Sequence, residues 1–573
     1  MTRTIPDRES DSGLLVLALV VGAGAGLGAV AFRWLVVTFT RVLSGHDDYA
    51  AAGRSAHPWL PGLGPWFLLL APVVAGLVYG PLVHAFAREA RGHGVPEVMD
   101  AVARRGGRIR PQVAGVKALA SALCIGGGGS VGREGPIVQI GSALGSTLGR
   151  LVRAEEDRTR ILVACGAAGG IAATFNAPLA GVFFAMELIL ADFAARSFGM
   201  VVLSSVTASV IGRAMLGDEP FLRLPPFSVE HPGEYLLFAL LGVLAGLVGV
   251  VFTRFLYLVE DGCDRVWRGP EWLRPAVGGL LLGVVLLALP QMYGVGYPVL
   301  GDGVAGAYTI GFLVVLLLGK MVATSLTIGI GGSGGVFAPS LFIGAMLGAA
   351  FGQAAGVVVP GLAGAAGAYG LIGMGAVFAG AARAPITAVV IMFELTGEYS
   401  IILPLMAAIV LATGVSHLVS EDSVYTLKLR RRGVVLGAHP TARRLASVSV
   451  GAVMTSGRRP VRAGDALVDA LADLATVERL AVVDADDRYL GVLTARAAAE
   501  ALADGGHGTA LVGDLLERVP PVVADQSLAE ALDVLDRTES SEVPVLDADE
   551  RLVGWLAHRQ VVGRLRTGPA VAV

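Results

Sequence analysis

One glycine-rich segment of the sequence occurs twice, and one copy carries an acid. Residues 129–136 read Gly-Ser-Val-Gly-Arg-Glu-Gly-Pro, and residues 332–339 read Gly-Ser-Gly-Gly-Val-Phe-Ala-Pro; they are called the acidic loop and the apolar loop below. Proline is favoured in the first turn of a helix, so each loop predicts a helix start with unpaired backbone N–H groups. Such helix starts bind anions. The chemistry that the pair predicts is two helix starts converging on one anion.

The acid of the acidic loop is Glu134, and it can compete with an anion. An ionised Glu134 can itself occupy an anion site, whereas a protonated one must leave it, so one side chain would link anion passage to proton uptake. A carboxylate on a transport path is costly and is functional by default. Two alternatives stay open. One is an ion pair with the adjacent Arg133, although neighbouring side chains rarely face each other on a helix; the other is that the glycines only allow close helix packing in lipid.

The composition predicts that these loops lie within a membrane. The chain has 573 residues, of which 54% are hydrophobic and 16% charged, and its mean hydropathy is +0.68. Soluble domains have about 25% charged residues. The net charge of -3 and the lack of basic runs interleaved with aromatic residues give no indication of a nucleic-acid partner. Cys124, Cys165 and Cys263 lie in or beside apolar stretches at no metal-like spacing, which indicates buried thiols and no metal site.

Apolar stretches recur from Leu14 to about Val419, and many are interrupted by glycine or proline. Shorter or broken pieces, among them 336–359, alternate with longer ones. Long spans are predicted at 14–43, 66–87, 178–196, 235–259, 274–290 and 400–419. Broken helices at membrane depth occur where they line a cavity or are buried in protein. When they take corresponding places in two halves of a chain, they indicate a transport site.

A second pair of copies supports a duplicated membrane part. Asn-Ala-Pro-Leu at 176–179 is followed by Glu187, and Arg-Ala-Pro-Ile at 383–386 is followed at the same distance by Glu394. This offset of 207 residues is close to the 203 residues between the acidic and apolar loops. The predicted repeats therefore span about 14–217 and 235–425. The sequence alone does not distinguish parallel from inverted repeats.

The composition changes after Tyr425. A basic cluster at 428–433 closes the membrane part, and the positive-inside rule places it in the cytoplasm, with the arginine-rich segment 88–110 on the same side. Residues 482–493 then match residues 545–556 at an offset of 63, and each copy has two short strands around an Asp-rich turn between helix patterns. These are two small α+β modules. The predicted parts are a cytoplasmic N-terminal tail (1–13), a membrane domain (14–428), a linker (429–448) and the modules 449–505 and 511–566.

At these motifs the sequence resembles the CLC family of chloride channels and chloride/proton antiporters, followed by a tandem pair of CBS domains. The resemblance covers about 14–428 and 449–566 and rests on Gly-Arg-Glu-Gly-Pro at 132–136 and Gly-Val-Phe-Ala-Pro at 335–339. It implies an all-α polytopic membrane protein of two inverted repeats of broken and tilted helices, followed by an α+β tandem CBS module. It also implies a homodimer with one pore per subunit, in the cell (inner) membrane, with a cytoplasmic N-terminus and CBS pair.

The resemblance also implies roles for individual residues. Glu134 is then the gating and proton-carrying glutamate. The backbone amides of Val336 and Phe337 face the central anion, and Tyr425 contributes its hydroxyl, unless Tyr425 is instead a tyrosine of the membrane interface. The full set of anion-binding candidates is His93, Gly132, Arg133, Gly135, Val336, Phe337 and Tyr425. No catalytic residue and no cofactor are implied.

Two departures from the family pattern concern the anion and the proton. Gly-His-Gly-Val-Pro at 92–96, the histidine loop, has His93 where the family has a serine that touches the anion. A neutral imidazole can still donate one hydrogen bond; alternatively the ring turns toward cytoplasmic water and only the backbone amides matter. Well-coupled antiporters often carry a second glutamate after the one that Glu187 matches, and here that position is Leu188. Glu187 and Glu394 are then structural acids that bind helix ends or pair with arginine.

A third departure lies in the CBS pair. Nucleotide-binding CBS modules have a serine or threonine followed three positions later by an aspartate. The first module keeps Thr494 but has Ala497 in place of the acid, and the second has Ala557 and Gln560. Thr494 stays a candidate contact for an adenine nucleotide, and a purely dimer-stabilising role is the alternative.

These observations predict transport of chloride or a similar small anion by an anion/proton antiporter with a glutamate gate. A passive chloride channel, gated by voltage or pH, is the alternative, and a CBS-regulated divalent-cation transporter is a more distant one. A hard cation needs several inward carboxylates, and the membrane part offers mainly Glu134, Glu187 and Glu394. An intramembrane zinc protease needs a His-Glu-x-x-His motif, which the sequence lacks, so no enzyme is expected. The expected partners are the anion, protons, a second copy of the chain and membrane lipid.

Overall fold

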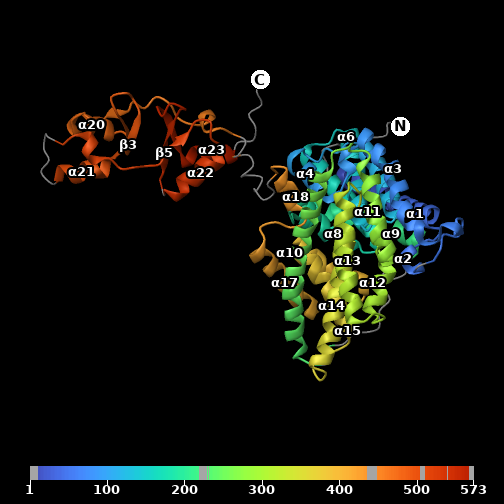
Figure 1. The fold of residues 1–573 in the computed structure, drawn as a ribbon. Coiled ribbons are helices and arrows are strands. Elements are labelled where there is room, and N and C mark those ends of the chain that lie inside the picture. The colour runs from blue at the N-terminus through green and yellow to red at the C-terminus, as the bar shows by residue number, and fades with distance from the viewer. Residues whose placement is uncertain are drawn as a thin grey trace. The chain divides into compact units, whose positions relative to one another are not determined.

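The structure is a computed structural model that describes residues 11–53, 55–217, 229, 231–434, 445, 448–503, 510–538 and 540–566. The predicted N-terminal tail (1–13) and linker (429–448) therefore lie largely outside the described residues. The chain divides into two compact units, Met1–Leu436 and Gly437–Val573, and Figure 1 shows the elements of both. Each unit is described by itself.

The first unit is built of helices in two series, one for each predicted repeat. The first series is α1 (Asp11–Ser44), α2 (Tyr49–Ala52), η1 (Pro61–Trp66), α3 (Phe67–Phe86), η2 (Arg88–Ala90), α4 (Val95–Arg104), α5 (Gln112–Gly126), α6 (Glu134–Leu151), α7 (Glu156–Phe175), α8 (Pro178–Phe184), η3 (Ala185–Leu190) and α9 (Ala195–Leu216). The second is α10 (Glu234–Val266), α11 (Arg274–Ala288), η4 (Pro290–Met292), α12 (Tyr297–Val304), α13 (Ile310–Gly329), α14 (Phe337–Val358), α15 (Ala366–Ala382), α16 (Pro385–Thr396), α17 (Ile402–Val419) and α18 (Thr426–Arg431).

Seven helices among the described residues are long and apolar enough to cross a membrane. The spans predicted at 178–196 and 274–290 are not among them. The first is divided, because α8 passes into the π-helix η3, the chain turns at Ala191 (φ 52°) and α9 starts anew; the second is the 15-residue helix α11. The piece at 336–359, predicted to be short or broken, is the 22-residue helix α14. The fold thus combines full crossings with short helices that begin inside the protein.

Helix pairs in equivalent places of the two repeats cross at glycines. Between α6 and α7, a Cβ atom added to Gly141 would lie 2.1 Å from the carbonyl oxygen of Gly166. Between α14 and α15, a Cβ atom added to Gly344 would lie 2.2 Å from the carbonyl oxygen of Gly373. Small residues allow this close approach, which supplies packing that the hydrophobic effect does not supply in lipid. The repeats therefore share tertiary packing as well as sequence.

We expect Gly141→Ala to destabilise the first unit, because the added methyl group must displace the backbone of α7. Overpacking of this kind costs about 1–3 kcal/mol. Gly115→Ala is the matched control: Gly115 also lies within a helix, α5, and an added Cβ there meets no atom within 4 Å. Its alanine variant should be neutral or slightly stabilising. Melting temperatures of the detergent-solubilised variants check the prediction, and equal values would show that the crossing tolerates a side chain.

The second unit consists of two modules, each with a three-stranded sheet. Around the first sheet lie β1 (Val461–Arg462), α20 (Leu467–Leu474), β2 (Arg479–Val483), β3 (Tyr489–Thr494), α21 (Ala495–Ala503) and η6 (Val512–Leu515). Around the second lie η5 (Val450–Ala452), β4 (Val522–Val523), α22 (Leu528–Arg537), β5 (Glu542–Leu546), β6 (Leu552–Ala557) and α23 (His558–Arg566). In each sheet the middle strand pairs with one parallel and one antiparallel neighbour.

The two sheets repeat each other in detail. Their registers shift at equivalent places, Val482/Val483 and Val545/Leu546. In the turns between the antiparallel strands, Asp484 and Asp547 each accept hydrogen bonds from two backbone N–H groups. The predicted pair of α+β modules with Asp-rich turns is confirmed.

Candidate functional site

The histidine, acidic and apolar loops meet in the first unit. The backbones of Gly132 and Gly335 exchange two N–H to O=C hydrogen bonds, each of 2.7 Å. The N–H of Gly92 donates to the carbonyl of Gly332 at 2.9 Å. A Cβ atom added to Gly135 would lie 2.0 Å from the carbonyl oxygen of His93. Glycine is therefore needed because backbone meets backbone here, and three loops far apart in the sequence form one centre.

Three helices begin at this centre. They are α4 after the histidine loop, α6 in the acidic loop and α14 in the apolar loop, and their N-cap residues are Gly94, Arg133 and Val336. Gly94 has no side chain, and the side chains of Arg133 and Val336 form no capping hydrogen bond to their helices. Unpaired N–H groups and the positive end of the helix dipole make such starts suitable for an anion.

The side chain of Glu134 lies at the start of the other repeat's helix. It is 1% exposed, and its Oε2 atom lies 3.4 Å from the backbone nitrogen of Ala338, in the first turn of α14. A Cβ atom added to Gly132 would meet the same oxygen at 2.0 Å, so the carboxylate folds back over the acidic loop. A carboxylate thus takes the position of an anion at this helix start.

The second oxygen of Glu134 has a partner that the sequence analysis missed. The hydroxyl of Tyr297 donates to Oε1 of Glu134 at 2.6 Å. Tyr297 is the first residue of α12 and belongs to Gly-Val-Gly-Tyr-Pro at 294–298, here called the tyrosine loop, which copies the histidine loop at an offset of 202 residues. That third repeated motif is a signal that could have found the loop, although the tyrosine itself corresponds to Val95 in the histidine loop.

One lysine from each repeat donates hydrogen bonds to the backbone carbonyls of the histidine loop or the tyrosine loop. Lys117 donates through Nζ to the carbonyl of Gly92 at 2.7 Å. Its repeat equivalent Lys320 donates to the carbonyls of Gly294 at 3.2 Å and Val295 at 2.9 Å. Both lysines are fully buried. The histidine and tyrosine loops are therefore structural equivalents, in which His93 corresponds to Val295 and Val95 corresponds to Tyr297.

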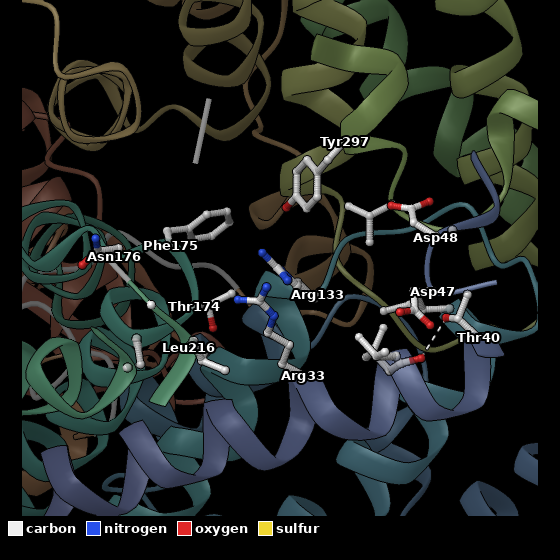
Figure 2. A pocket seen from close by; sticks show the side chains of 18 of the residues that line it. Arg33, Thr40, Asp47, Asp48, Arg133, Thr174, Phe175, Asn176, Leu216 and Tyr297 are labelled. Atoms are coloured by element: carbon white, nitrogen blue, oxygen red, sulfur yellow. Dashed lines mark hydrogen bonds between the residues drawn. The ribbon is translucent and has the colours of Figure 1, made fainter. Parts of the chain in front are cut away.

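Arg133 faces a cavity next to Glu134. Its guanidinium carbon lies 5.2 Å from the ring centre of Tyr297 and 5.9 Å from that of Phe175, distances typical of cation–π contacts. A cavity of about 430 Å³ borders all three side chains, and Figure 2 shows Arg133 between Phe175 and Tyr297. Arg133 therefore borders this cavity, whereas the carboxylate oxygens of Glu134 lie against Tyr297 and Ala338.

His93 is enclosed by protein. Its side chain is 0% exposed, and neither ring nitrogen has a hydrogen-bond partner among the described residues. The centre of its ring lies 6.1 Å from that of Tyr257. The alternative that the ring turns toward cytoplasmic water is therefore wrong. A buried polar group without a partner is costly, and a bound ligand in the pathway would remove that cost.

The remaining anion-binding candidates are also buried. Val336 and Phe337 are each 2% exposed, and Tyr425 is 1% exposed, which does not fit a tyrosine of the membrane interface. The Phe337 ring contacts Phe378, with 4.5 Å between ring centres. Tyr425 is close enough to Glu134 for an electrostatic interaction between them.

Glu187 and Glu394 each accept hydrogen bonds from the first turn of a helix in the other repeat. The carboxylate of Glu187 accepts hydrogen bonds from the backbone nitrogens of Ile386 (3.2 Å) and Thr387 (2.8 Å), at the start of α16. The carboxylate of Glu394 accepts from Leu179 (2.9 Å) and Ala180 (2.7 Å), at the start of α8. Each acid thus satisfies the N–H groups that follow the first proline of the other repeat's helix.

In the CBS pair, the residues at the nucleotide positions are engaged internally. The hydroxyl of Thr494 donates to Oε1 of Glu517 at 2.9 Å. Gln560 donates through Nε2 to the hydroxyl oxygen of Thr455 at 2.6 Å and to the carbonyl of Val453 at 3.1 Å. The side chain of Thr494 is therefore already engaged within the CBS pair.

Comparisons with known proteins agree with this geometry. The family model described as "Voltage gated chloride channel" matches residues 75–417, and the CBS domain model matches residues 450–504 and 512–566. An H(+)/Cl(-) exchange transporter ClcA from Vibrio parahaemolyticus is 35% identical over 428 residues, which cover 73% of this chain and 89% of the relative. A putative chloride channel protein ClcB-like from Ralstonia nicotianae is 32% identical over 422 residues, covering 73% and 97%.

Solved structures show the same fold. A slow cyanobacterial Cl-/H+ antiporter has a TM-score of 0.65 at 27% identity and covers 73% of this chain and 97% of its own. A eukaryotic CLC transporter has a TM-score of 0.62 at 21% identity and covers 96% of this chain and 97% of its own, which shows a shared fold. The chain therefore belongs to the voltage gated chloride channel (CLC) family and carries two CBS domains after its membrane part.

Proposed function

We propose that this protein exchanges chloride, or a similar small anion, for protons across a membrane, with Glu134 as the gate. The observation that carries the proposal is the buried carboxylate of Glu134 at the first turn of α14, where an anion would bind. The exchange activity in the names of the relatives and of the cyanobacterial antiporter supports the same function.

The proposed anion path uses helix starts in place of full positive charges. An anion that leaves water must recover most of its solvation energy inside the protein. A helix start offers about half an elementary charge and several N–H donors, so it can bind an anion without trapping it. We assign the contacts to the backbones of the acidic and apolar loops and to two side chains, the imidazole of His93 and the hydroxyl of Tyr425.

Protonation of Glu134 would open this path. An ionised Glu134 lies at the start of α14 and accepts a hydrogen bond from the hydroxyl of Tyr297. A proton added to one carboxylate oxygen removes the negative charge and weakens both contacts, so the side chain leaves and an anion takes its place. When Glu134 returns, it must release its proton. The anion and the proton then use the same position in turn, which couples their opposite movements.

The route by which protons reach Glu134 does not use residue 188. Leu188 is buried and cannot carry a proton. This is the observation that favours the passive channel as a second candidate, because a channel needs no internal proton carrier.

Flux across a vesicle membrane distinguishes the two candidates. We would reconstitute the full chain in liposomes with equal chloride on both sides and impose a pH gradient. An exchanger drives chloride against its own gradient, and its reversal potential shifts with pH. A channel's reversal potential follows chloride alone, which would contradict the proposal of exchange while keeping that of anion transport.

We expect His93→Ser to change anion selectivity. Serine is smaller than histidine and donates one hydrogen bond from a different position, so the relative permeabilities of chloride, bromide and nitrate should change, by about tenfold for one good hydrogen bond. His84→Ser is the control, because His84 is exposed at the end of α3. Reversal potentials under mixed-anion conditions measure the ratios. Unchanged ratios in His93→Ser would remove this ring from the anion path.

We expect Tyr297→Phe to let the gate open at higher pH. The phenol stabilises the ionised carboxylate with a hydrogen bond worth about 1.5–3 kcal/mol, so its loss makes protonation easier and moves the pH midpoint of anion flux upward by about one to two units. Tyr369→Phe is the matched control and should leave the pH midpoint unchanged, because the buried Tyr369 hydroxyl has no hydrogen-bond partner among the described residues. Flux measured from pH 4 to pH 8 tests both; a midpoint that stays in place or falls in Tyr297→Phe contradicts the assignment.

We further propose the cell (inner) membrane as the location, with the N-terminus and CBS pair (449–505 and 511–566) in the cytoplasm, and a homodimer as the assembly. Arginines gather in 88–110 and 428–433, and Arg432 forms an ion pair of 2.9 Å with Glu97, which supports one side for both segments. Protease access to the CBS pair in sealed inside-out vesicles tests the orientation.

A further inference from the structure

Lys320 is a buried lysine that the proposed cycle of Glu134 does not use. It lies on α13 and is 0% exposed. Its Nζ atom donates to the hydroxyl oxygen of Ser130 at 2.9 Å and to the carbonyl oxygens of Gly294 at 3.2 Å and Val295 at 2.9 Å. An ammonium group has three N–H donors, so donors and acceptors match in number. A charge can be buried when it is satisfied in this way, and the site therefore fits the ammonium form.

Two more side chains of α13 hold the acidic loop at Ser130. The hydroxyl of Thr324 donates to the carbonyl of Ser130 at 2.7 Å. The hydroxyl oxygen of Thr327 accepts the backbone N–H of Ser130 at 3.2 Å. Lys320, Thr324 and Thr327 are spaced by four and three residues, so they share one face of the helix. Ser130 comes four residues before Glu134, so a helix of the second repeat fixes the loop that carries Glu134.

The equivalent lysine of the first repeat is bound differently. Lys117 donates to two carbonyl oxygens, those of Ala90 at 2.9 Å and Gly92 at 2.7 Å. Ser333 is the repeat equivalent of Ser130, and its hydroxyl donates to the carbonyl of Ala90 at 2.6 Å. Among the described residues, no hydrogen bond joins Lys117 to Ser333. The contact between lysine and serine is therefore made to the acidic loop and has no counterpart at the apolar loop.

The charges that face Lys320 include Glu134. Its ammonium interacts with Glu134 and with Asp48, the N-cap residue of α2. Asp48 also interacts with Arg133, which is a second cation near Glu134. The ring of Phe342, from α14, lies 5.1 Å from the ammonium nitrogen. Lys320 is fully buried, whereas Arg133 borders the cavity. Because buried charges are screened less than charges beside water, the charge of Lys320 acts on Glu134 more strongly than its lack of direct contact suggests.

We infer that Lys320 is a positioning residue that stabilises ionised Glu134 and thereby sets the pH at which the proposed gate opens. Its ammonium joins the acidic loop to the tyrosine loop, which carries the hydroxyl that Tyr297 donates to the carboxylate. Its positive charge favours the negative form of Glu134. The other groups that face this carboxylate are Arg133, Tyr297 and Tyr425. The inference rests on the proposed function and adds to it the residue that holds the gate closed.

Lys320→Gln in the full-length protein tests this role. Glutamine has no charge but keeps N–H donors for the carbonyl oxygens of the tyrosine loop. Ionised Glu134 then loses a favourable charge and takes up a proton more readily, so the pH midpoint of anion flux in liposomes should rise by about one unit. Lys320→Arg keeps the charge and should keep the midpoint near that of wild type. Lys117→Gln is the matched control, because it makes the same change at the equivalent buried lysine, and its midpoint should not move.

Two further variants separate this role from a general loosening of the fold. In a Glu134→Gln protein, adding Lys320→Gln should leave the flux independent of pH, because no carboxylate remains to take up a proton. Ser130→Ala is a milder change that keeps the lysine and removes its contact with the acidic loop. Its midpoint should rise by about half a unit, the effect of one lost hydrogen bond. Ser130→Ala decides the question if Lys320→Gln does not fold.

Three results would overturn the inference. They are an unchanged midpoint in folded Lys320→Gln, an equal rise in Lys117→Gln, and, where Lys320→Gln does not fold, an unchanged midpoint in Ser130→Ala. A wild-type protein that moves no anion, or whose flux ignores pH, would instead refute the proposed function and the inference with it. A wild-type flux that depends on pH, with midpoints that do not move in the variants, would refute the role of Lys320 alone.

Discussion

Glu134→Gln is expected to abolish proton coupling while anion flux continues. Glutamine has nearly the shape of glutamate but carries no charge and takes up no proton, so the start of α14 stays open to anions at every pH. The chloride flux of the variant should lose its pH dependence. A pH gradient should no longer drive chloride, so the coupled component should fall to the detection limit.

The control for this variant is Glu155→Gln, because the side chain of Glu155 is exposed before α7 and makes no capping hydrogen bond. It should couple as the wild type does. Chloride and proton fluxes recorded together in the same liposomes give the ratio directly. A Glu134→Gln protein that still moves protons against a chloride gradient would disprove the gate assignment. A variant without anion flux but with a wild-type melting temperature would show that the carboxylate is needed for anion passage itself.

Glu187→Ala is expected to have the largest effect on folding. The Glu187 carboxylate accepts three hydrogen bonds, from the backbone nitrogens of Ile386 and Thr387 and from the hydroxyl of Thr387. Alanine leaves these three donors without their acceptor at the start of α16, where the backbone N–H groups have no partner within the helix. The cost should reach about 3–5 kcal/mol, a large part of the stability of most domains.

The same argument applies to Glu394→Ala at the start of α8, so the two variants should lose similar stability. Glu155→Ala is the matched control and should be close to neutral. Yield after size-exclusion chromatography and melting temperature measure the effect. Glu187→Gln keeps one acceptor oxygen and should be milder, with an unchanged ratio of chloride to protons. A changed ratio in a stable Glu187→Gln protein would instead place Glu187 on the proton route.

Much of the centre can be predicted from sequence because glycine and proline act locally. The spacing of the acidic and apolar loops predicts the starts of α6 and α14 without any knowledge of the tertiary structure. Hydropathy, by contrast, does not register the turn at Ala191 (φ 52°) that divides α8 and η3 from α9, so it predicts one span where the chain has two helical segments.

Contacts between distant residues are the part that the sequence does not reveal. Tyr297 reaches Glu134 across 163 residues, and tyrosine has no repeat partner in the histidine loop, where Val95 takes its place. The contacts of Arg133 with the rings of Tyr297 and Phe175 are equally hidden, because a single arginine at a helix start does not show what faces it. Comparing the two repeats predicts such contacts only where both repeats have the same residue at the equivalent position, as they do at Glu187 and Glu394.

The two hydrogen bonds between Gly132 and Gly335 have a consequence for the speed of the transport cycle. They tie the backbones of the acidic and apolar loops together, so the loop that carries Glu134 cannot swing away without breaking both. The carboxylate of Glu134 must then move by rotation about side-chain bonds, which is a fast motion, whereas rocking of whole repeats takes microseconds to milliseconds. Turnover would accordingly be limited by proton delivery and by stripping water from the anion, and it should show a solvent isotope effect when protons are scarce.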